Sequence, residues 1–123
     1  MQYSTTLTGT ESIVVTIGNF DGIHKGHQEL MHKVGTLARE LQSVPVLLTF
    51  RSHTLKVVRP EIDVRCLTTL EEKLDLARVY GGIKDSIVVD FTPEVAAMSA
   101  SEFMGDLRAH FKLRGLVVGA NFS

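Results

Sequence analysis

The chain has 123 residues, of which 44% are hydrophobic, and its formal net charge is only -1. This composition predicts one globular domain with a sizeable core, and the near-neutral charge argues against partners such as nucleic acid or an anionic membrane surface. The lone Cys66 excludes an internal disulfide, the apolar runs are too short to span a membrane, and the polar N-terminus does not resemble a secretory signal. We therefore expect a reducing, cytoplasmic setting.

Strand and helix patterns alternate along the chain. Short β-branched runs indicate strands buried on both faces, whereas apolar residues at spacings of three and four indicate helices. The predicted order is a strand over residues 12–17, a helix over 27–41, a strand over 44–50, a loop over 51–66, a helix over 70–80, a strand over 86–90, a helix over 100–111 and a strand over 116–118. Capping patterns at Thr92 and Ser99 indicate helix starts, and Gly35 inside the first helix predicts close packing on the sheet.

This alternation predicts an α/β domain with a Rossmann-like parallel sheet and right-handed crossovers. In such sheets ligands bind at the carboxyl ends of the strands. The segments that follow the predicted strands, and that should meet at this edge, are residues 18–27, 50–53, 90–92 and 119–123.

The most informative of these segments is residues 18–28. Three glycines at four-residue spacing permit close approach to the backbone, and the following helix aims free N–H groups and its positive dipole end at the loop. These features indicate a phosphate site, although neither a P-loop nor a dinucleotide-binding glycine pattern is present. His24 and His27 fit three interpretations: donors to phosphate, metal ligands with Asp21 as a third, or helix-capping residues. The glycines and the pairing favour phosphate.

The sequence of this segment, Gly-Asn-Phe-Asp-Gly-Ile-His-Lys-Gly-His-Gln, resembles the nucleotidyltransferase signature of prokaryotic FAD synthetases, the adenylyltransferase module of bifunctional riboflavin kinase/FMN adenylyltransferases. The resemblance covers essentially the whole chain. Its further matches are Leu48-Thr49-Phe50 with His53, Arg59-Pro60, Leu67-Thr68-Thr69 with Glu72-Lys73, Phe91-Thr92, Ser99-Ala100-Ser101-Glu102-Phe103, and Val118-Gly119-Ala120-Asn121-Phe122.

The resemblance implies transfer of AMP from ATP to FMN, giving FAD and pyrophosphate, with Mg²⁺ accompanying ATP. It implies His24 and His27 as donors to the ATP phosphates, and Phe50 and His53 on the flavin side. The nucleotide-binding residues that it implies are Gly18, Phe20, Asp21, Gly22, Gly26 and Asn121. Lys25, Arg51 and Arg59 are open to phosphate contact, but a solvated surface role is favoured for each.

Two departures from the family pattern set limits on this interpretation. Ser52 and Thr54 stand where the family usually has prolines around His53. Family members also continue to a later Ser/Thr-rich phosphate-binding segment and a riboflavin kinase domain, so residues 1–123 are expected to be a truncated nucleotidyltransferase domain. The remaining alternatives are nucleotidyl transfer to another phosphorylated acceptor and a non-catalytic nucleotide-binding module.

Overall fold

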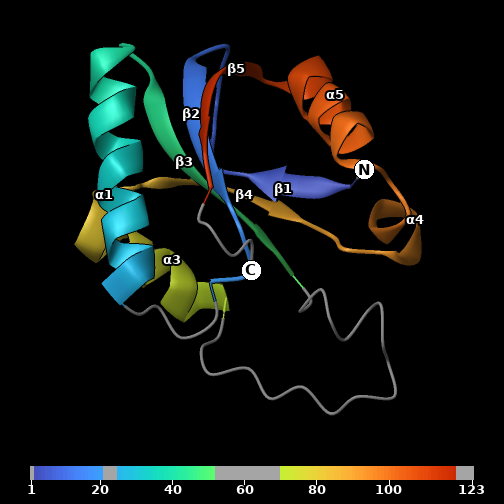
Figure 1. Cartoon of the computed structure of the whole chain (residues 1–123), viewed down its shortest axis with the longest axis horizontal. Coiled ribbons are helices and arrows are strands. Elements are labelled where there is room, and N and C mark those ends of the chain that lie inside the picture. Colours follow the sequence, from blue (N-terminus) through green and yellow to red (C-terminus); the bar gives the residue numbers. More distant parts are fainter. Residues whose placement is uncertain (1, 21–24, 52–69, 119–123) are drawn as a thin grey trace.

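In the computed structural model of the protein, residues 2–20, 25–51 and 70–118 are described below. They form a five-stranded sheet with helices on both faces (Figure 1). The elements are β1 (Tyr3–Thr5), β2 (Ser12–Ile17), α1 (Lys25–Glu40), β3 (Val44–Phe50), α3 (Leu70–Gly81), β4 (Asp85–Val89), α4 (Pro93–Ala96), α5 (Ala100–His110) and β5 (Lys112–Val117).

The strand order in the sheet is β1-β4-β3-β2-β5. The strands β4, β3, β2 and β5 pair in parallel, which confirms the α/β class and the Rossmann-like arrangement. A fifth strand that was not predicted, β1, pairs antiparallel to β4 at one edge of the sheet. This short strand lacks an apolar run, and its pairing with residues 87–89 is a long-range contact that local periodicity does not reveal.

The last strand begins earlier than predicted, at Lys112 rather than at residue 116. Gly115 lies inside β5 instead of preceding it, beside a register shift at Ile13 and Val14 of β2. A Cβ atom at Gly115 would lie 3.3 Å from Leu37 of α1 and 3.4 Å from Val14. The glycine therefore lets α1 and β5 pack closely. From sequence alone, a glycine at this position indicates only an interruption of the strand.

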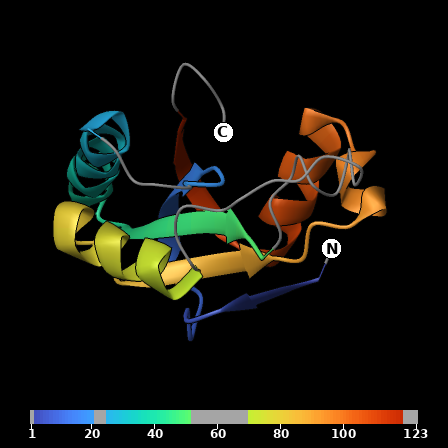
Figure 2. The same cartoon turned by 90° about the horizontal axis from the view of Figure 1, so that it is seen from below.

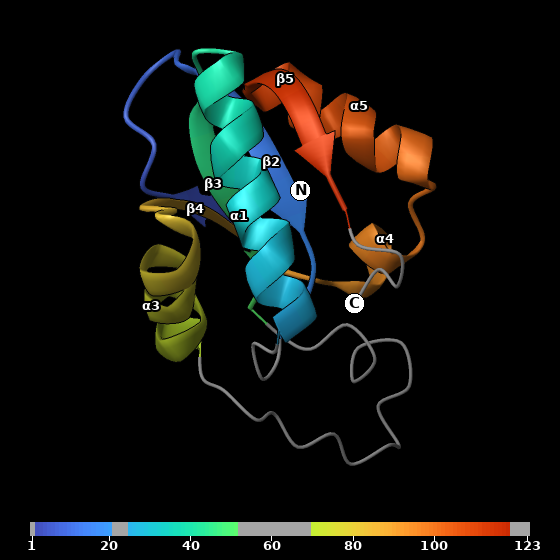
Figure 3. The same cartoon turned by 60° about the vertical axis from the view of Figure 1, so that its left-hand side comes forward.

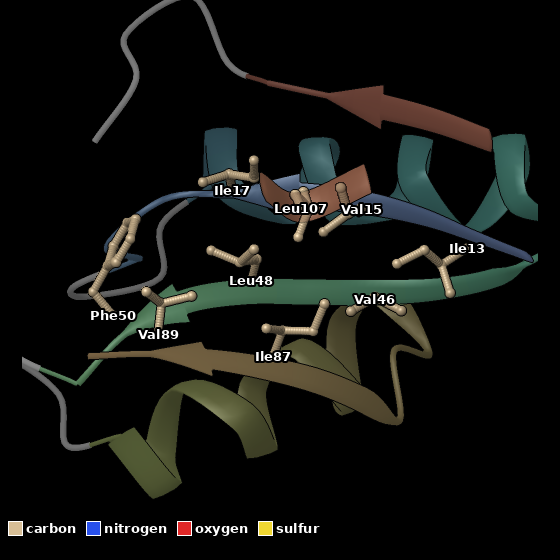
Figure 4. Packing of buried hydrophobic residues seen from close by; sticks show 9 residues of the cluster. All are labelled: Ile13, Val15, Ile17, Val46, Leu48, Phe50, Ile87, Val89 and Leu107. Carbon is tan, nitrogen blue, oxygen red and sulfur yellow. The ribbon is translucent and has the colours of Figure 1, made fainter. Parts of the chain in front are cut away.

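The core has two parts, one on each face of the sheet. Figures 1 and 2 show α1 and α3 on one side, and α4 and α5 on the other. Alternate residues of the central strands supply both parts, since successive side chains of a strand point to opposite faces. The cluster facing α5 consists of Ile13, Val15, Ile17, Val46, Leu48, Phe50, Ile87, Val89 and Leu107, with Phe50 at the end where β3 stops (Figure 4). The cluster facing α1 consists of Val14, Phe20, Met31, Val34, Ala38, Leu47, Ala77 and Ile83.

Two of the predicted helix starts are confirmed. The Thr92 side chain accepts a hydrogen bond from the Val95 N–H at 3.3 Å, and α4 starts with Pro93. At α5, the Ser99 hydroxyl accepts from the Glu102 N–H at 3.1 Å, and the Glu102 carboxylate accepts from the Ser99 N–H at 3.1 Å. These bonds satisfy backbone donors that a helix start otherwise leaves unpaired.

The α5 capping box predicts a pH dependence of stability. The hydrogen bond from the Ser99 backbone, followed by that from its side chain, holds the pKa of Glu102 below its ordinary value of 4.5. A lowered carboxyl pKa contributes stability above the ordinary value, and this contribution is lost as the pH falls through the lowered pKa. In urea unfolding at several pH values, Glu102→Gln should therefore lose less stability on acidification than the unchanged chain. If both proteins lost the same stability as the pH is lowered, this account of the cap would be contradicted.

The two helices on one face approach each other closely through glycines. The Gly81 carbonyl oxygen lies 3.2 Å from the position of a Cβ at Gly35, so Gly35 packs against the end of α3 and not, as expected, on the sheet. A Cβ at Gly81 would lie 2.7 Å from the Met31 Cβ. This contact fixes the place of α3 beside α1.

We expect Gly81→Ala to lower the free energy of unfolding by about 1–3 kcal/mol, because the new methyl group overlaps Met31. Gly105→Ala in α5 is the matched control, since nothing lies within 4 Å of its Cβ position. It should stabilise the protein by up to about 1 kcal/mol through helix propensity. Denaturant unfolding measures both values. An unchanged free energy of unfolding in Gly81→Ala would show that α1 and α3 can shift to accommodate the methyl group at little cost.

Candidate functional site

The central strand β2 places the candidate site at the carboxyl edge of the sheet. Its neighbours are β3, which follows it along the chain, and β5, which arrives from the far end of the chain. The chain therefore adds β3 and β4 on one side of β2 and β5 on the other, so the order in which strands are added reverses between β2 and β5. In such sheets ligands bind beyond the carboxyl ends of the strands at this reversal point. Figure 3 shows the starts of α1 and α3 and the end of β5 at this edge.

The turn after β2 is held by the neighbouring strand. The Gly18 N–H donates to the Leu48 carbonyl oxygen at 3.2 Å, and the Thr49 hydroxyl donates to the Asn19 carbonyl oxygen at 3.2 Å. All of the residues from Ile13 to Phe20 are buried. The backbone of this turn is thus fixed by β3 before any ligand arrives.

Phe20 adopts a conformation that is unusual for a bulky residue. Its φ angle is 54°, in the left-handed region, where side chains other than glycine carry a strain on the order of 1–2 kcal/mol. Its side chain is 1% exposed and belongs to the core cluster facing α1. Burial of the ring among residues that face α1 offsets this strain.

His27 lies in the first turn of α1 and meets this ring. The two ring centroids are 5.3 Å apart with an interplanar angle of 74°, an edge-to-face contact. The His27 residue is half-buried, and its Nδ1 atom is shielded from solvent. The first turn of α1 carries no acidic residue, which suits an anion at this helix start.

The structure thus brings some predicted site residues together. Gly18, Phe20 and His27 share the turn and the helix that follows it, and Gly26 is the second residue of α1. Phe50 ends β3 on the opposite face of the sheet. The other predicted site residues, which are Asp21, Gly22, His24, His53 and Asn121, lie outside the described part of the chain.

Phe50 faces an apolar cavity of about 360 Å³. Its ring makes an edge contact with Phe91, with centroids 5.0 Å apart, and lies 6.5 Å from the Phe103 ring. Ile17 of β2 and the exposed Leu116 of β5 complete the wall on the strand side. The cavity lies between the strand ends and α4 and α5, so it opens at the same edge as the turn on the other face.

Arg51 is held at the surface by a carboxylate. Its Nε donates to the Asp90 Oδ1 at 2.8 Å, and its Nη2 donates to the Ser4 hydroxyl at 3.1 Å. The side chain is 54% exposed. Such an exposed pair contributes little stability. Its hydrogen bonds link the residue after β3 to the residue after β4 and to β1.

Sequence reasoning missed a group of buried polar side chains at this edge. Thr16 and Thr49, both fully buried, lie near the ends of β2 and β3, and Lys73 in the first turn of α3 is only 5% exposed. The Thr16 hydroxyl has no hydrogen-bond partner among the described residues. The burial of Lys73 could have been inferred from its spacing. It lies one helical turn from Ala77, so both residues share a helix face, and both are buried.

Metal ligands and membrane spans were also sought in the part of the chain that the structure describes. Within it, no three His, Cys, Asp or Glu side chains are placed to hold a metal ion. None of its helices is both long and apolar enough to cross a membrane. The alternative in which Asp21 joins both histidines around a metal falls on residues outside the described part.

Comparison with protein families gives a clear match. The family model described as FAD synthetase matches residues 7–123. The bifunctional riboflavin kinase/FMN adenylyltransferase of Escherichia coli (strain K12) is 33% identical over 113 residues, covering 91% of this chain and 36% of that protein. The FAD synthetase of Listeria monocytogenes serovar 1/2a is 30% identical over 115 residues, covering 93% of this chain and 46% of that protein. The chain therefore spans less than half the length of these relatives.

A solved structure has the same fold. It is described as a macrolide-efflux protein from Streptococcus pneumoniae, and it matches with a TM-score of 0.81 and 25% sequence identity. The match covers 94% of this chain and 45% of that one. It supports the α/β arrangement from which the site was built.

The two buried threonines predict stability changes of opposite sign. Thr16→Val should raise the free energy of unfolding by about 1 kcal/mol, because it removes a buried hydroxyl that has no partner among the described residues. Thr49→Val is the matched control and should lower it by about 1 kcal/mol, because the bond to the Asn19 carbonyl oxygen is lost. Urea unfolding measures both, and a loss of stability in Thr16→Val would reveal a hydrogen bond from that hydroxyl.

Proposed function

The chain belongs to the FAD synthetase family, and from this premise we propose that it transfers AMP from ATP to FMN, giving FAD and pyrophosphate. The observation that carries the proposal is the turn after β2, which presents His27 at the start of α1 beside the reversal point of the sheet. Both features belong to the class of site that binds phosphate groups.

The reaction needs positioning more than acid–base chemistry. A phosphate oxygen of FMN attacks the α-phosphorus of ATP, and the bond from that phosphorus to the departing pyrophosphate breaks. Because the attacking oxygen is already anionic, no general base is required. His27, with His24, donates N–H groups to the ATP phosphates as negative charge moves to the leaving group, and the N–H groups at the start of α1 assist.

On the nucleotide side, we assign backbone contacts to the turn. Phe20 contributes its main chain, since its ring is buried against α1. Gly18 and Gly26 allow the nucleotide to approach closely, as glycine has no Cβ. We assign the same part of the site to Asp21, Gly22 and Asn121 by their match to the family signature.

On the acceptor side, the apolar cavity supports binding of a flat aromatic ring. Phe50, Phe91 and Phe103 offer edges and faces for a flavin, and the cavity volume of about 360 Å³ is in the range of small-ligand pockets. His53 is proposed to join this side of the site. FMN would then reach over the end of β2 with its phosphate toward the turn.

We propose that Mg²⁺ enters the site together with the ATP phosphates. The ion would neutralise charge on the departing pyrophosphate, as divalent metals do in phosphoryl transfer.

The proposal is tested by incubating the protein with ATP, Mg²⁺ and FMN and measuring FAD and pyrophosphate. His27→Ala should lower kcat by about 10²-fold or more with little change in ATP affinity, because its bond strengthens in the transition state. His32→Ala is the matched control, as His32 is an exposed residue of the same helix.

Three results would argue against parts of the proposal. A rise in KM for ATP at constant kcat would make His27 a ground-state contact only. Pyrophosphate release with another phosphorylated acceptor, but not with FMN, would change the assigned acceptor. ATP binding without release of pyrophosphate would favour a non-catalytic nucleotide-binding module.

A further inference from the structure

Thr49 places a hydroxyl in a strand that is otherwise apolar. The sequence of β3 is Val-Pro-Val-Leu-Leu-Thr-Phe, and its last five residues are buried. A valine would fill the same space without a polar atom, and a buried hydroxyl costs free energy unless it makes a hydrogen bond. The partner of this hydroxyl is therefore informative.

That partner is the peptide group that precedes the strained residue of the turn. The Thr49 hydroxyl donates to the Asn19 carbonyl oxygen at 3.2 Å, in a buried bond between residues that are 30 positions apart. The oxygen belongs to the Asn19–Phe20 peptide group, whose orientation about the N–Cα bond of Phe20 sets the φ angle of Phe20. The bond from β3 thus holds this angle at 54°.

Without the hydrogen bond the turn has a way to relax. Rotation of the planar Asn19–Phe20 peptide would carry the φ angle of Phe20 from the left-handed region to the extended region that bulky residues prefer. The same rotation would break the bond to Thr49. A buried hydrogen bond and the strain of one left-handed residue are similar in magnitude, so the bond can decide which orientation the peptide adopts.

The orientation of this peptide bears on the binding of an anion. In a trans peptide the N–H and the carbonyl oxygen point in opposite directions, so the Phe20 N–H is directed away from Thr49. A rotated peptide would put a carbonyl oxygen where the N–H now points. Backbone N–H groups attract phosphate, whereas carbonyl oxygens repel it. The bond from Thr49 therefore favours the orientation that suits a phosphate site.

The same bond bears on His27 through the Phe20 ring. This ring is 1% exposed, belongs to the cluster facing α1 and contacts the His27 ring edge to face, with centroids 5.3 Å apart. Because the backbone of Phe20 carries the ring, a relaxed φ angle would alter the surface against which His27 packs. One hydrogen bond, one peptide group and one ring contact thus join Thr49 to His27.

We propose that Thr49 is a positioning residue of the site, whose hydroxyl holds the Asn19–Phe20 peptide in its strained orientation and so sets the place of the Phe20 N–H and the His27 ring. Its effect on catalysis rests on the proposed function. Its hold on the turn rests only on contacts within the ligand-free protein.

The first test compares Thr49→Val with Thr49→Ser in the full chain. Valine removes the hydroxyl and keeps the branched shape, whereas serine keeps the hydroxyl and removes a buried methyl group. For FAD formation, Thr49→Val should lower kcat/KM for ATP about 10-fold or more, because misplaced groups lose transition-state stabilisation. Thr49→Ser should retain most of kcat/KM, although the lost methyl group lowers its unfolding temperature. With a merely structural threonine, the rates would follow stability in both variants.

Two further variants serve as controls. The Thr5 hydroxyl also donates to a distant backbone carbonyl oxygen, that of Ser86 at 2.8 Å, but it lies in the edge strand β1. Thr5→Val should therefore leave kcat/KM unchanged. If Thr49→Val does not fold, Thr49→Ala replaces it, since alanine and serine differ only in the hydroxyl.

The second test does not depend on the reaction. The NMR chemical shifts of the His27 ring protons report the packing of this ring on Phe20, since aromatic rings shift the signals of nearby protons. In the ligand-free protein at one pH, these signals should move or double in Thr49→Val and stay in place in Thr49→Ser. His110 of α5 makes a similar edge contact with Tyr3, with centroids 5.4 Å apart, and its signals should not move.

Two results would overturn the inference. One is that kcat/KM and the His27 signals are both unchanged in Thr49→Val. The other is that the valine and serine variants lose kcat/KM equally, in step with their unfolding temperatures. The two proposals fail separately. If the unchanged chain makes no FAD but the His27 signals move only in Thr49→Val, the proposed reaction fails and the hold of Thr49 on the turn stands.

Discussion

The pairing of β2 with β3 is the constraint on which the candidate site depends. The ladder between these strands continues past the end of β2, where the Gly18 N–H reaches the Leu48 carbonyl oxygen at 3.2 Å. One residue later, Thr49 holds the Asn19 carbonyl oxygen. The strained Phe20 is therefore positioned by a neighbouring strand and by core packing. This arrangement would preorganise the proposed phosphate site.

The alternation of side chains along β2 and β3 gives the two faces of the site different chemistry. One face carries Thr16 and Thr49 near the strand ends, and the other carries Ile17 and Phe50. Both faces open at the same edge of the sheet, so a polar, anionic ligand and a flat, apolar one can meet at the end of one strand. The proposed reaction between a nucleotide and a flavin phosphate would use such a division, which the period of two residues in a strand supplies.

The parts of this fold that could be predicted from sequence are those set by local interactions. The bounds of β2 and β3 follow from runs of branched residues, and the start of α5 follows from Ser99 and Glu102, which bond to each other. The strand β1 and the early start of β5 were missed because their pairing partners lie far away in sequence. Lys73 was missed for another reason: burial of a charge is decided by the packing of α3 on α1, which the helical pattern alone does not report.

The antiparallel pairing of β1 with β4 also bears on how the chain folds as it is synthesised. The Thr5 hydroxyl donates to the Ser86 carbonyl oxygen across a separation of 81 residues, so β1 is synthesised well before the strand with which it pairs. Contacts of such long range form slowly, and until they form β4 presents an open strand edge to other chains. The three residues of β1 thus act as a cover for that edge. A chain still under synthesis remains able to pair wrongly at β4 until β1 has docked there.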